Sequence, residues 1–169
     1  MGIYLGETEI IKAFLGNSEV KSIFLGEVQV YPIAQTSRAT YTVEAVDGVT
    51  YGFGLNSNGY YESQNKGRTN SYALCKVIID NPDGQNVYFD CINYAENYYD
   101  FGFLGKVGET LANNRYVDSS VFHSFKSSHS ASVQTVGYGE ISGKIYVKYI
   151  KDGSGNENND SLQFKVRFE

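Results

Sequence analysis

Few side chains in this sequence have the chemistry of a nucleophile or a general base. The histidines are His123 and His129, and the cysteines are Cys75 and Cys91. A serine nucleophile needs a strained turn around it and a base held in a fixed orientation. The Ser-rich segment 122–130, which contains both histidines, shows no such motif. We interpret it as a polar surface loop, predict no catalytic residue, and expect that the protein is not an enzyme.

Carboxylates gather in two groups that could bind a metal ion or work as an acid–base pair. The first group is Asp90, Glu96 and Asp100, and the second is Asp152, Glu157 and Asp160, with asparagines between the members of each. Such oxygen ligands suit Ca²⁺, and a carboxylate pair suits glycoside hydrolysis. However, the loop that starts at Asp152 lacks a glutamate at its twelfth position, and no spacing singles out a pair. We interpret both groups as solvated turn residues and predict no metal and no cofactor.

Two adjacent tyrosine pairs, Tyr60-Tyr61 and Tyr98-Tyr99, are the candidate binding residues of this sequence. Neighbouring side chains of a strand point to opposite faces, so one member of each pair is expected in the core and the other on the surface. An outward tyrosine near Asn, Gln and Glu suits a protein interface or the stacking of a sugar ring. We predict a ligand or partner surface here, and the absence of Trp favours the interface.

The two cysteines lie in strand-like segments, Cys75 in 71–79 and Cys91 in 86–94. They could face each other across paired strands. Without a secretion signal, free thiols are expected rather than a disulfide.

The composition excludes several classes of protein. The chain has 169 residues, of which 41% are hydrophobic and 20% charged, and its net charge is −5. No stretch approaches the roughly 20 apolar residues of a membrane span, and the N-terminus lacks the pattern of a signal peptide. An acidic balance without a block of Lys or Arg argues against nucleic-acid binding. We therefore expect no membrane insertion and no nucleic-acid partner.

The sequence is typical of an all-β protein. Aromatic residues suit strands, and the abundant Gly, Asn and Ser suit turns. About eight strands are expected after residue 39, at 40–46, 49–55, 71–79, 86–94, 98–104, 133–138, 144–150 and 162–168. Turn residues at 47–48 and 80–84 predict that the first four strands form two hairpins. Segment 108–132 is expected to be mostly irregular, with a helical turn near 109–113, and the whole to be a jelly-roll-like β-sandwich.

The last expected strand alternates between apolar and polar residues. Its apolar positions are Leu162, Phe164, Val166 and Phe168, and its polar positions are Gln163, Lys165 and Arg167. This pattern predicts a strand with one buried side and one side at the surface.

Residues 3–32 repeat with a period of ten. Tyr4-Leu5-Gly6 recurs as Phe14-Leu15-Gly16 and as Phe24-Leu25-Gly26. Glycine tolerates the backbone angles of tight turns, so each unit predicts two short strands around a turn. Because a ten-residue unit cannot bury its own apolar face, the repeats must stack on each other or on copies from other chains. We predict that these nine residues serve docking or oligomerisation, with a homotrimer as the expected assembly; the alternative is a short meander packed on its own domain.

A boundary is expected near residue 36. Pro32 ends the last repeat, and residues 33–38 form a short polar segment typical of a linker. The sequence therefore predicts a small threefold β-repeat in residues 1–36 and a β-sandwich in residues 37–169.

The repeat, which ends in Val30-Tyr31-Pro32, resembles one found at the start of virion proteins of tailed phages of gut bacteria, the crAss-like group among them. There it is an attachment or oligomerisation element ahead of varied C-terminal domains in head-fibre, tail and baseplate-type proteins. Segments 56–63, 71–75, 93–96 with Tyr99-Asp100, and 151–154 with Asn159-Asp160 are similar to motifs of jelly-roll domains in such phages and of bacterial carbohydrate-binding modules. The resemblance implies a virion location after synthesis in the host bacterial cytoplasm, and it carries over no binding residue.

Two functional hypotheses follow. The first is a virion structural protein, a head fibre or capsid decoration that docks on capsid or tail proteins through its repeat and projects the sandwich outward. The second is a carbohydrate-binding adhesin module of a tail fibre or baseplate that attaches to host-surface or gut glycans.

Overall fold

A computed structural model describes residues 37–95, 100–126, 128–152 and 159–169 in full, together with the backbone of six short strands before residue 32. The chain divides into two compact units, Met1–Ser37 and Arg38–Glu169. This division lies one residue from the boundary that the sequence predicts. The described residues contain no helix that is long and apolar enough to cross a membrane.

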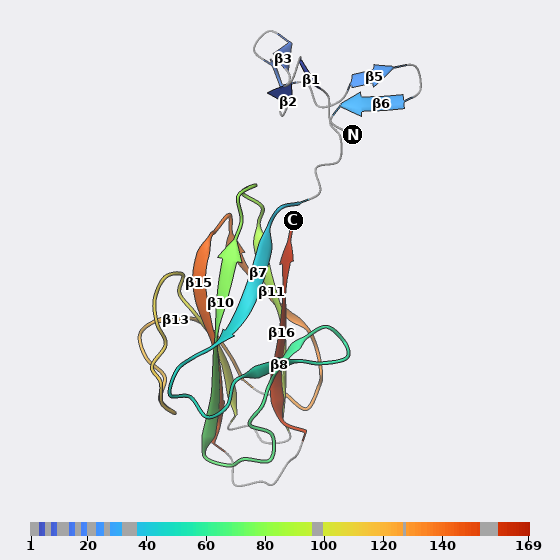
Figure 1. The fold of residues 1–169 in the computed structure, drawn as a ribbon. Helices are drawn as coiled ribbons and strands as arrows, with labels where there is room; N and C mark the ends of the chain where they lie inside the picture. The colour runs from blue at the N-terminus through green and yellow to red at the C-terminus, as the bar shows by residue number, and fades with distance from the viewer. Residues whose placement is uncertain are drawn as a thin grey trace. The chain divides into compact units, whose positions relative to one another are not determined.

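The second unit is an all-β sandwich of two antiparallel five-stranded sheets, as predicted (Figure 1). The first sheet has the order β13-β12-β15-β10-β7 and the second the order β14-β11-β16-β9-β8. The chain changes sheet at most of its connections, which makes the sandwich jelly-roll-like. The first sheet consists of β7 (Thr40–Ala45), β10 (Ser71–Asp80), β12 (Phe101–Gly105), β13 (Val121–Lys126) and β15 (Gly143–Lys151). The second consists of β8 (Phe53–Leu55), β9 (Tyr61–Ser63), β11 (Val87–Tyr94), β14 (Gln134–Gly139) and β16 (Ser161–Phe168).

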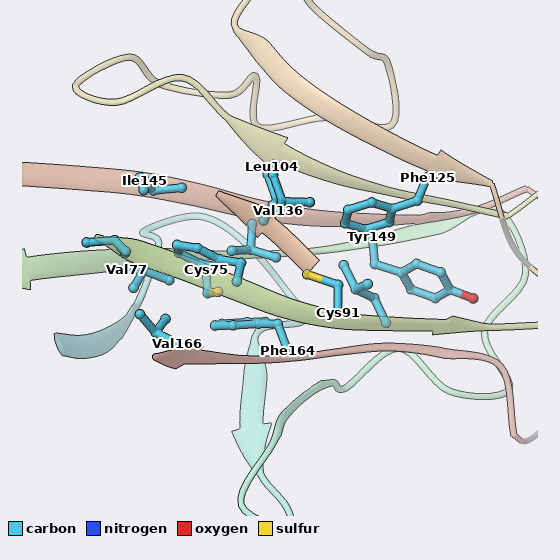
Figure 2. Packing of buried hydrophobic residues seen from close by; sticks show 14 of the residues in the cluster. Cys75, Val77, Cys91, Leu104, Phe125, Val136, Ile145, Tyr149, Phe164 and Val166 are labelled. Atoms are coloured by element: carbon cyan, nitrogen blue, oxygen red, sulfur yellow. The ribbon is translucent and has the colours of Figure 1, made fainter. Parts of the chain in front are cut away.

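The core lies between the sheets because alternate residues of most strands are apolar and point inward. Figure 2 shows this packing, in which β10 and β15 of the first sheet face β11 and β16 of the second. In β16, Leu162, Phe164 and Val166 are buried and the residues between them are not, which confirms the predicted alternation. Phe164 is at the centre, with its ring 5.5–5.9 Å from the rings of Phe53, Tyr61 and Phe89.

The first sheet is also covered on its outer side. A second apolar cluster consists of Leu74, Phe103, Leu111, Tyr146 and Ile150, and the loop between β12 and β13 supplies Leu111. Strand β15 is therefore buried on both faces from Ile145 to Lys151. The second sheet differs, since Gln163, Lys165 and Arg167 of β16 are only partly buried on its outer side.

Both predicted hairpins are wrong. Strands β7 and β8 lie in different sheets, and so do β10 and β11. The turns themselves exist, because Val49 donates a backbone hydrogen bond to Val46 and Gly84 donates one to Asn81. Each turn carries the chain across to the opposite sheet. In its own sheet, β10 pairs with β7 on one side and with β15 on the other, so β11 cannot pair with it there.

The prediction for segment 108–132 is also partly wrong. Residues 121–126 form β13, which pairs with β12, and residues 109–113 form an irregular loop without the predicted helical turn. The apolar and polar residues of β13 do not alternate cleanly, because only Phe125 is buried there. Because this edge strand buries only one side chain, its sequence lacks the alternation of apolar and polar residues that predicts a strand. The sequence does not predict β9, because its three residues stand within the polar, Gly- and Asn-rich segment 56–70.

Within the first unit, the backbone forms three two-stranded antiparallel hairpins at the spacing of the repeat. They pair β1 (Tyr4–Leu5) with β2 (Thr8–Glu9), β3 (Phe14–Leu15) with β4 (Ser18–Glu19), and β5 (Ile23–Leu25) with β6 (Val28–Tyr31). Each aromatic-leucine pair thus lies in the first strand of its hairpin. The three glycines, Gly6, Gly16 and Gly26, fall outside the described residues.

Candidate functional site

The outer face of the second sheet gathers tyrosine and charged side chains. By strand alternation it carries Tyr60, Glu62, Tyr88, Asp90, Ile92, Tyr94, Thr135, Gln163, Lys165 and Arg167. We call this set the tyrosine face. The register places Tyr88 beside Arg167 and Asp90 beside Lys165, so rings and charges from neighbouring strands meet.

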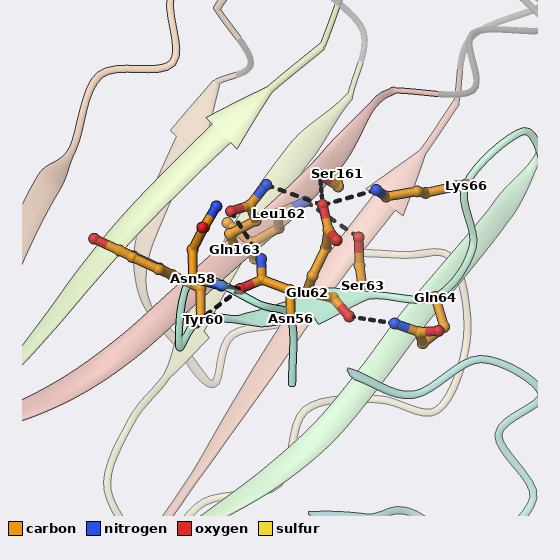
Figure 3. Close-up of polar contacts among 10 residues, drawn as sticks. All are labelled: Asn56, Asn58, Tyr60, Glu62, Ser63, Gln64, Lys66, Ser161, Leu162 and Gln163. Carbon is orange, nitrogen blue, oxygen red and sulfur yellow. Dashed lines mark hydrogen bonds and ion pairs between the residues drawn. The ribbon is translucent and has the colours of Figure 1, made fainter. Parts of the chain in front are cut away.

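A tight loop before β9 presents Tyr60. The side-chain Oδ1 of Asn56 accepts hydrogen bonds from the backbone N–H groups of Asn58 and Tyr60, both at 3.0 Å (Figure 3). Asn56 also donates its backbone N–H to the carbonyl of Tyr60 at 2.8 Å, which closes the loop. Gly59 has a φ of 78°, a backbone angle that favours glycine. The sequence Asn-x-Asn-Gly-Tyr therefore holds the backbone of Tyr60 in a fixed position.

Glu62 ties this loop to β16. Its Oε1 accepts hydrogen bonds from Ser161 Oγ at 2.8 Å and Gln163 Nε2 at 2.9 Å, and it pairs with Lys66 Nζ at 2.9 Å (Figure 3). The side chain of Glu62 is only 14% exposed. Because these donors already occupy the carboxylate, we assign Glu62 a structural role in holding the strands together and not a role in ligand binding.

A second polar group lies further along β16. Asp90 accepts hydrogen bonds from Arg167 Nε at 2.8 Å and from Thr135 Oγ1 at 2.7 Å. Burial raises the pKa of Asp90, but these two hydrogen bonds and the charge of Arg167 outweigh it and leave the pKa below its usual value. The hydrogen bond to Asp90 in turn raises the pKa of Arg167. Both groups therefore stay charged at neutral pH.

Cations lie over two of the tyrosine rings. Lys165 Nζ is 5.0 Å from the centre of the Tyr60 ring, and the Arg167 guanidinium is 4.9 Å from that of Tyr88. Such contacts hold both partners in place. With Glu62 and Asp90 nearby, positive and negative side chains balance on this face. A balanced face of rings and hydrogen-bonding groups suits a neutral, hydroxyl-rich ligand or a polar protein surface better than a polyanion.

The predicted tyrosine pairs have different outcomes. Tyr60 points outward and Tyr61 inward, where the Tyr61 ring stacks on Phe164 at 5.6 Å, so the prediction of one residue on each face is confirmed. Tyr61 is therefore a core residue and not part of a binding surface. Tyr98 and Tyr99 lie outside the described residues.

The interpretation of the carboxylates as solvated turn residues is wrong for three of them. Asp90, Asp100 and Asp160 are all buried. Asp100 and Asp160, one from each predicted group, both approach the buried Lys151 amine. Glu96 and Glu157 lie outside the described residues. Among the residues that the structure describes, no three His, Cys, Asp or Glu side chains come together in a way that could hold a metal ion.

The other candidate groups lie apart from this face. His123 and His129 are exposed, and His123 belongs to β13 instead of a loop. Cys75 and Cys91 are buried free thiols, as expected, but they lie in facing sheets and not on paired strands (Figure 2). Burial raises the pKa of both thiols, so neither is a reactive nucleophile.

The sequence alone did not predict that five residues of the tyrosine face form one surface. They are Tyr88, Asp90, Tyr94, Lys165 and Arg167. The signal was partly present, because the alternation of the last strand already put Lys165 and Arg167 on its polar side. What the sequence did not contain is the pairing of β16 with β11, which brings Tyr88 and Asp90 next to them.

Comparisons with known proteins add little. No protein-family model matches the chain, and no curated protein is similar to it. Among solved structures, the chain is similar to the secreted serine protease VesC from Vibrio cholerae, with 7% identity and a TM-score of 0.47. The match covers 71% of this chain and 23% of that protein, so this chain spans less than a quarter of its length. A likeness at this level carries no argument about fold or function.

Proposed function

We propose that this protein is a non-enzymatic virion structural protein, a head fibre or capsid decoration that attaches through its N-terminal repeat and displays the β-sandwich. The observation that carries the proposal is the separation of the chain into two compact units, with three equally spaced hairpins in the first. Hairpins of two strands are marginally stable alone, so these need a partner surface. Other virion proteins, or two further copies of this chain in a homotrimer, would supply it.

The test measures mass and attachment in two variants. Light scattering on the full chain and on residues 37–169 separates self-assembly from docking. A full chain of three times 18.8 kDa that becomes monomeric on truncation supports a fibre built through the repeat. Two monomers support docking on a virion partner, and the truncated protein should then be absent from purified particles. Truncated protein recovered in particles at normal copy number overturns the proposal.

A second candidate function is the binding of a neutral glycan on the tyrosine face. The supporting observation is the balanced set of rings and hydrogen-bonding groups around Tyr60 and Tyr88. Sugar rings stack on tyrosine while their hydroxyl groups bind side chains of this kind. This role is compatible with display on a virion.

Its test is retention of the protein on a panel of immobilised neutral polysaccharides. Tyr60→Ala and Tyr88→Ala are expected to lose retention, while Tyr116→Ala, which removes a 73% exposed tyrosine away from this face, should not. Failure of the unaltered protein to bind any member, or equal retention of all variants, counts against glycan binding and leaves the attachment proposal intact.

A further inference from the structure

Three ionisable side chains meet inside the sandwich at one end. The Lys151 amine lies 2.8 Å from Oδ2 of Asp160 and 4.0 Å from Oδ2 of Asp100. All three side chains are buried, with 1% of Lys151 and none of either aspartate exposed. This arrangement is unusual, because lysine and aspartate are rarely buried to this degree.

The strand pattern puts all three between the sheets. Along β15, Ile145, Val147 and Tyr149 point into the core, and Lys151 is the next residue in that alternation. Asp160 stands two residues before the inward Leu162 of β16. Asp100 stands two residues before Gly102, whose missing Cβ leaves room for Phe125 and Leu162. The end of β15 and the residues just before β12 and β16 therefore each place a charged side chain where an apolar residue would normally lie.

We propose that Lys151 and Asp160 condense into an isopeptide bond that joins the two sheets. The Nζ lone pair attacks Cγ of Asp160, an N–C bond forms, and the C–O bond to one carboxyl oxygen breaks. One proton passes from Nζ to the leaving oxygen, which departs as water. The reaction needs no oxidant, reductant or other reactant.

Asp100 is the proton carrier of this step. Its Oδ1 accepts a hydrogen bond from the Asp152 backbone N–H at 2.9 Å, and its Oδ2 accepts one from the Tyr149 hydroxyl at 3.1 Å. These contacts aim the carboxylate at the reacting pair. It takes the proton from Nζ and returns it to the leaving oxygen, and it ends the reaction unchanged. Groups that transfer protons often lie beyond hydrogen-bond distance before reaction and close in as it proceeds.

Burial and fixed geometry favour the bond. Moving one proton across the 2.8 Å contact turns the ion pair into a neutral amine and a carboxylic acid, the two forms that condense. Groups held this close react as if at very high concentration. The product also carries no charge at Lys151 or Asp160, which removes two ions from a dry interior where charges are costly.

The first experiment is the intact mass of the full-length protein under denaturing conditions. We expect a mass one water molecule below that of the sequence. Trypsin should fail to cut after Lys151, so that residues 149–165 form one peptide that is lighter by the same water, and fragmentation should link Lys151 to Asp160. A protein at its full sequence mass overturns the proposal.

Three variants separate this bond from water loss at Asp-Gly steps such as Asp152-Gly153. Lys151→Arg should keep its full mass, and a loss of water that persists in it overturns the proposal. Asp160→Asn should lose ammonia instead of water, since the leaving group changes. Asp100→Asn should form the bond much more slowly, and an unchanged rate would overturn its role as proton carrier. The peptide analysis of the unaltered protein holds whether or not a variant folds.

Discussion

Asp90 is a buried carboxylate that the fold keeps ionised. Burial raises the pKa of this group, but hydrogen bonds from Thr135 and Arg167 and the Arg167 charge lower it by more. The pKa in the folded state is therefore below that in the unfolded chain. A group of this kind stabilises the protein at pH values above its unfolded pKa of about 3.9, and the contribution is lost as the pH falls through the folded value.

We expect Asp90→Asn to lower the free energy of unfolding at pH 7 and to flatten its decrease under acid conditions. The amide cannot ionise, so the part of the acid sensitivity that belongs to Asp90 disappears. Urea unfolding at a series of pH values between about 2 and 7 measures both effects. An acid limb identical to that of the unaltered protein would contradict the account of Asp90.

Cys75 and Cys91 offer a second test at the level of single residues. Both thiols are buried, and burial raises the pKa of each, so the thiolate is scarce in the folded protein. We expect an aromatic disulfide reagent to label neither cysteine at pH 8 in the native state and both after unfolding without a reductant. Two unreactive cysteines in the unfolded chain would reveal a disulfide, and rapid labelling of the native protein would contradict their burial.

Among the strands, local pattern and partner choice were predictable to different degrees. The alternation in β16 follows directly from its sequence, because burial of one side determines which residue types stand at every second position. The same pattern says nothing about which strand lies alongside. For that reason β10 and β11 were expected as a hairpin and lie in different sheets, and the tyrosine face, which needs β11 beside β16, was only found in part.

Gly102 in β12 is the position where an added methyl group should cost most. A Cβ there would lie 2.4 Å from Phe125 and 3.0 Å from Leu162, both of which are buried. We expect Gly102→Ala to destabilise the sandwich by about 1–3 kcal/mol through overpacking. The matched control is Gly52→Ala, since nothing lies within 4 Å of a Cβ at that position, and its effect should stay within about 0.5 kcal/mol. Equal unfolding midpoints in urea would contradict this packing of β12 on β13.

At the scale of the whole molecule, the two compact units predict independent folding. Among the residues that the structure describes, the buried core residues of the sandwich come from its own strands, β10 to β16. We expect residues 37–169 to unfold cooperatively with a free energy within about 0.5 kcal/mol of the same transition in the full chain. Scanning calorimetry on both proteins measures this. A large loss of stability on truncation would show that the repeat contributes to the sandwich core.

Both ends of the sandwich are fastened to the connection between β10 and β11. Arg38 donates its backbone N–H to Asp83 at 2.8 Å, and Glu169 exchanges two backbone hydrogen bonds with Asn86 at 2.7 and 3.0 Å. Mechanical load therefore acts differently according to where it is applied. When the sandwich is pulled by its two ends, we expect its hydrogen bonds to break one after another, starting at this connection. When the sandwich is instead held at Arg38 and pulled at Asn114, in the loop beyond β12, the force acts along the length of β7. Its six residue pairs with β10 must then break together. Force spectroscopy should find the second geometry the stronger, which is the direction of drag on a domain tethered to a surface by its N-terminal end.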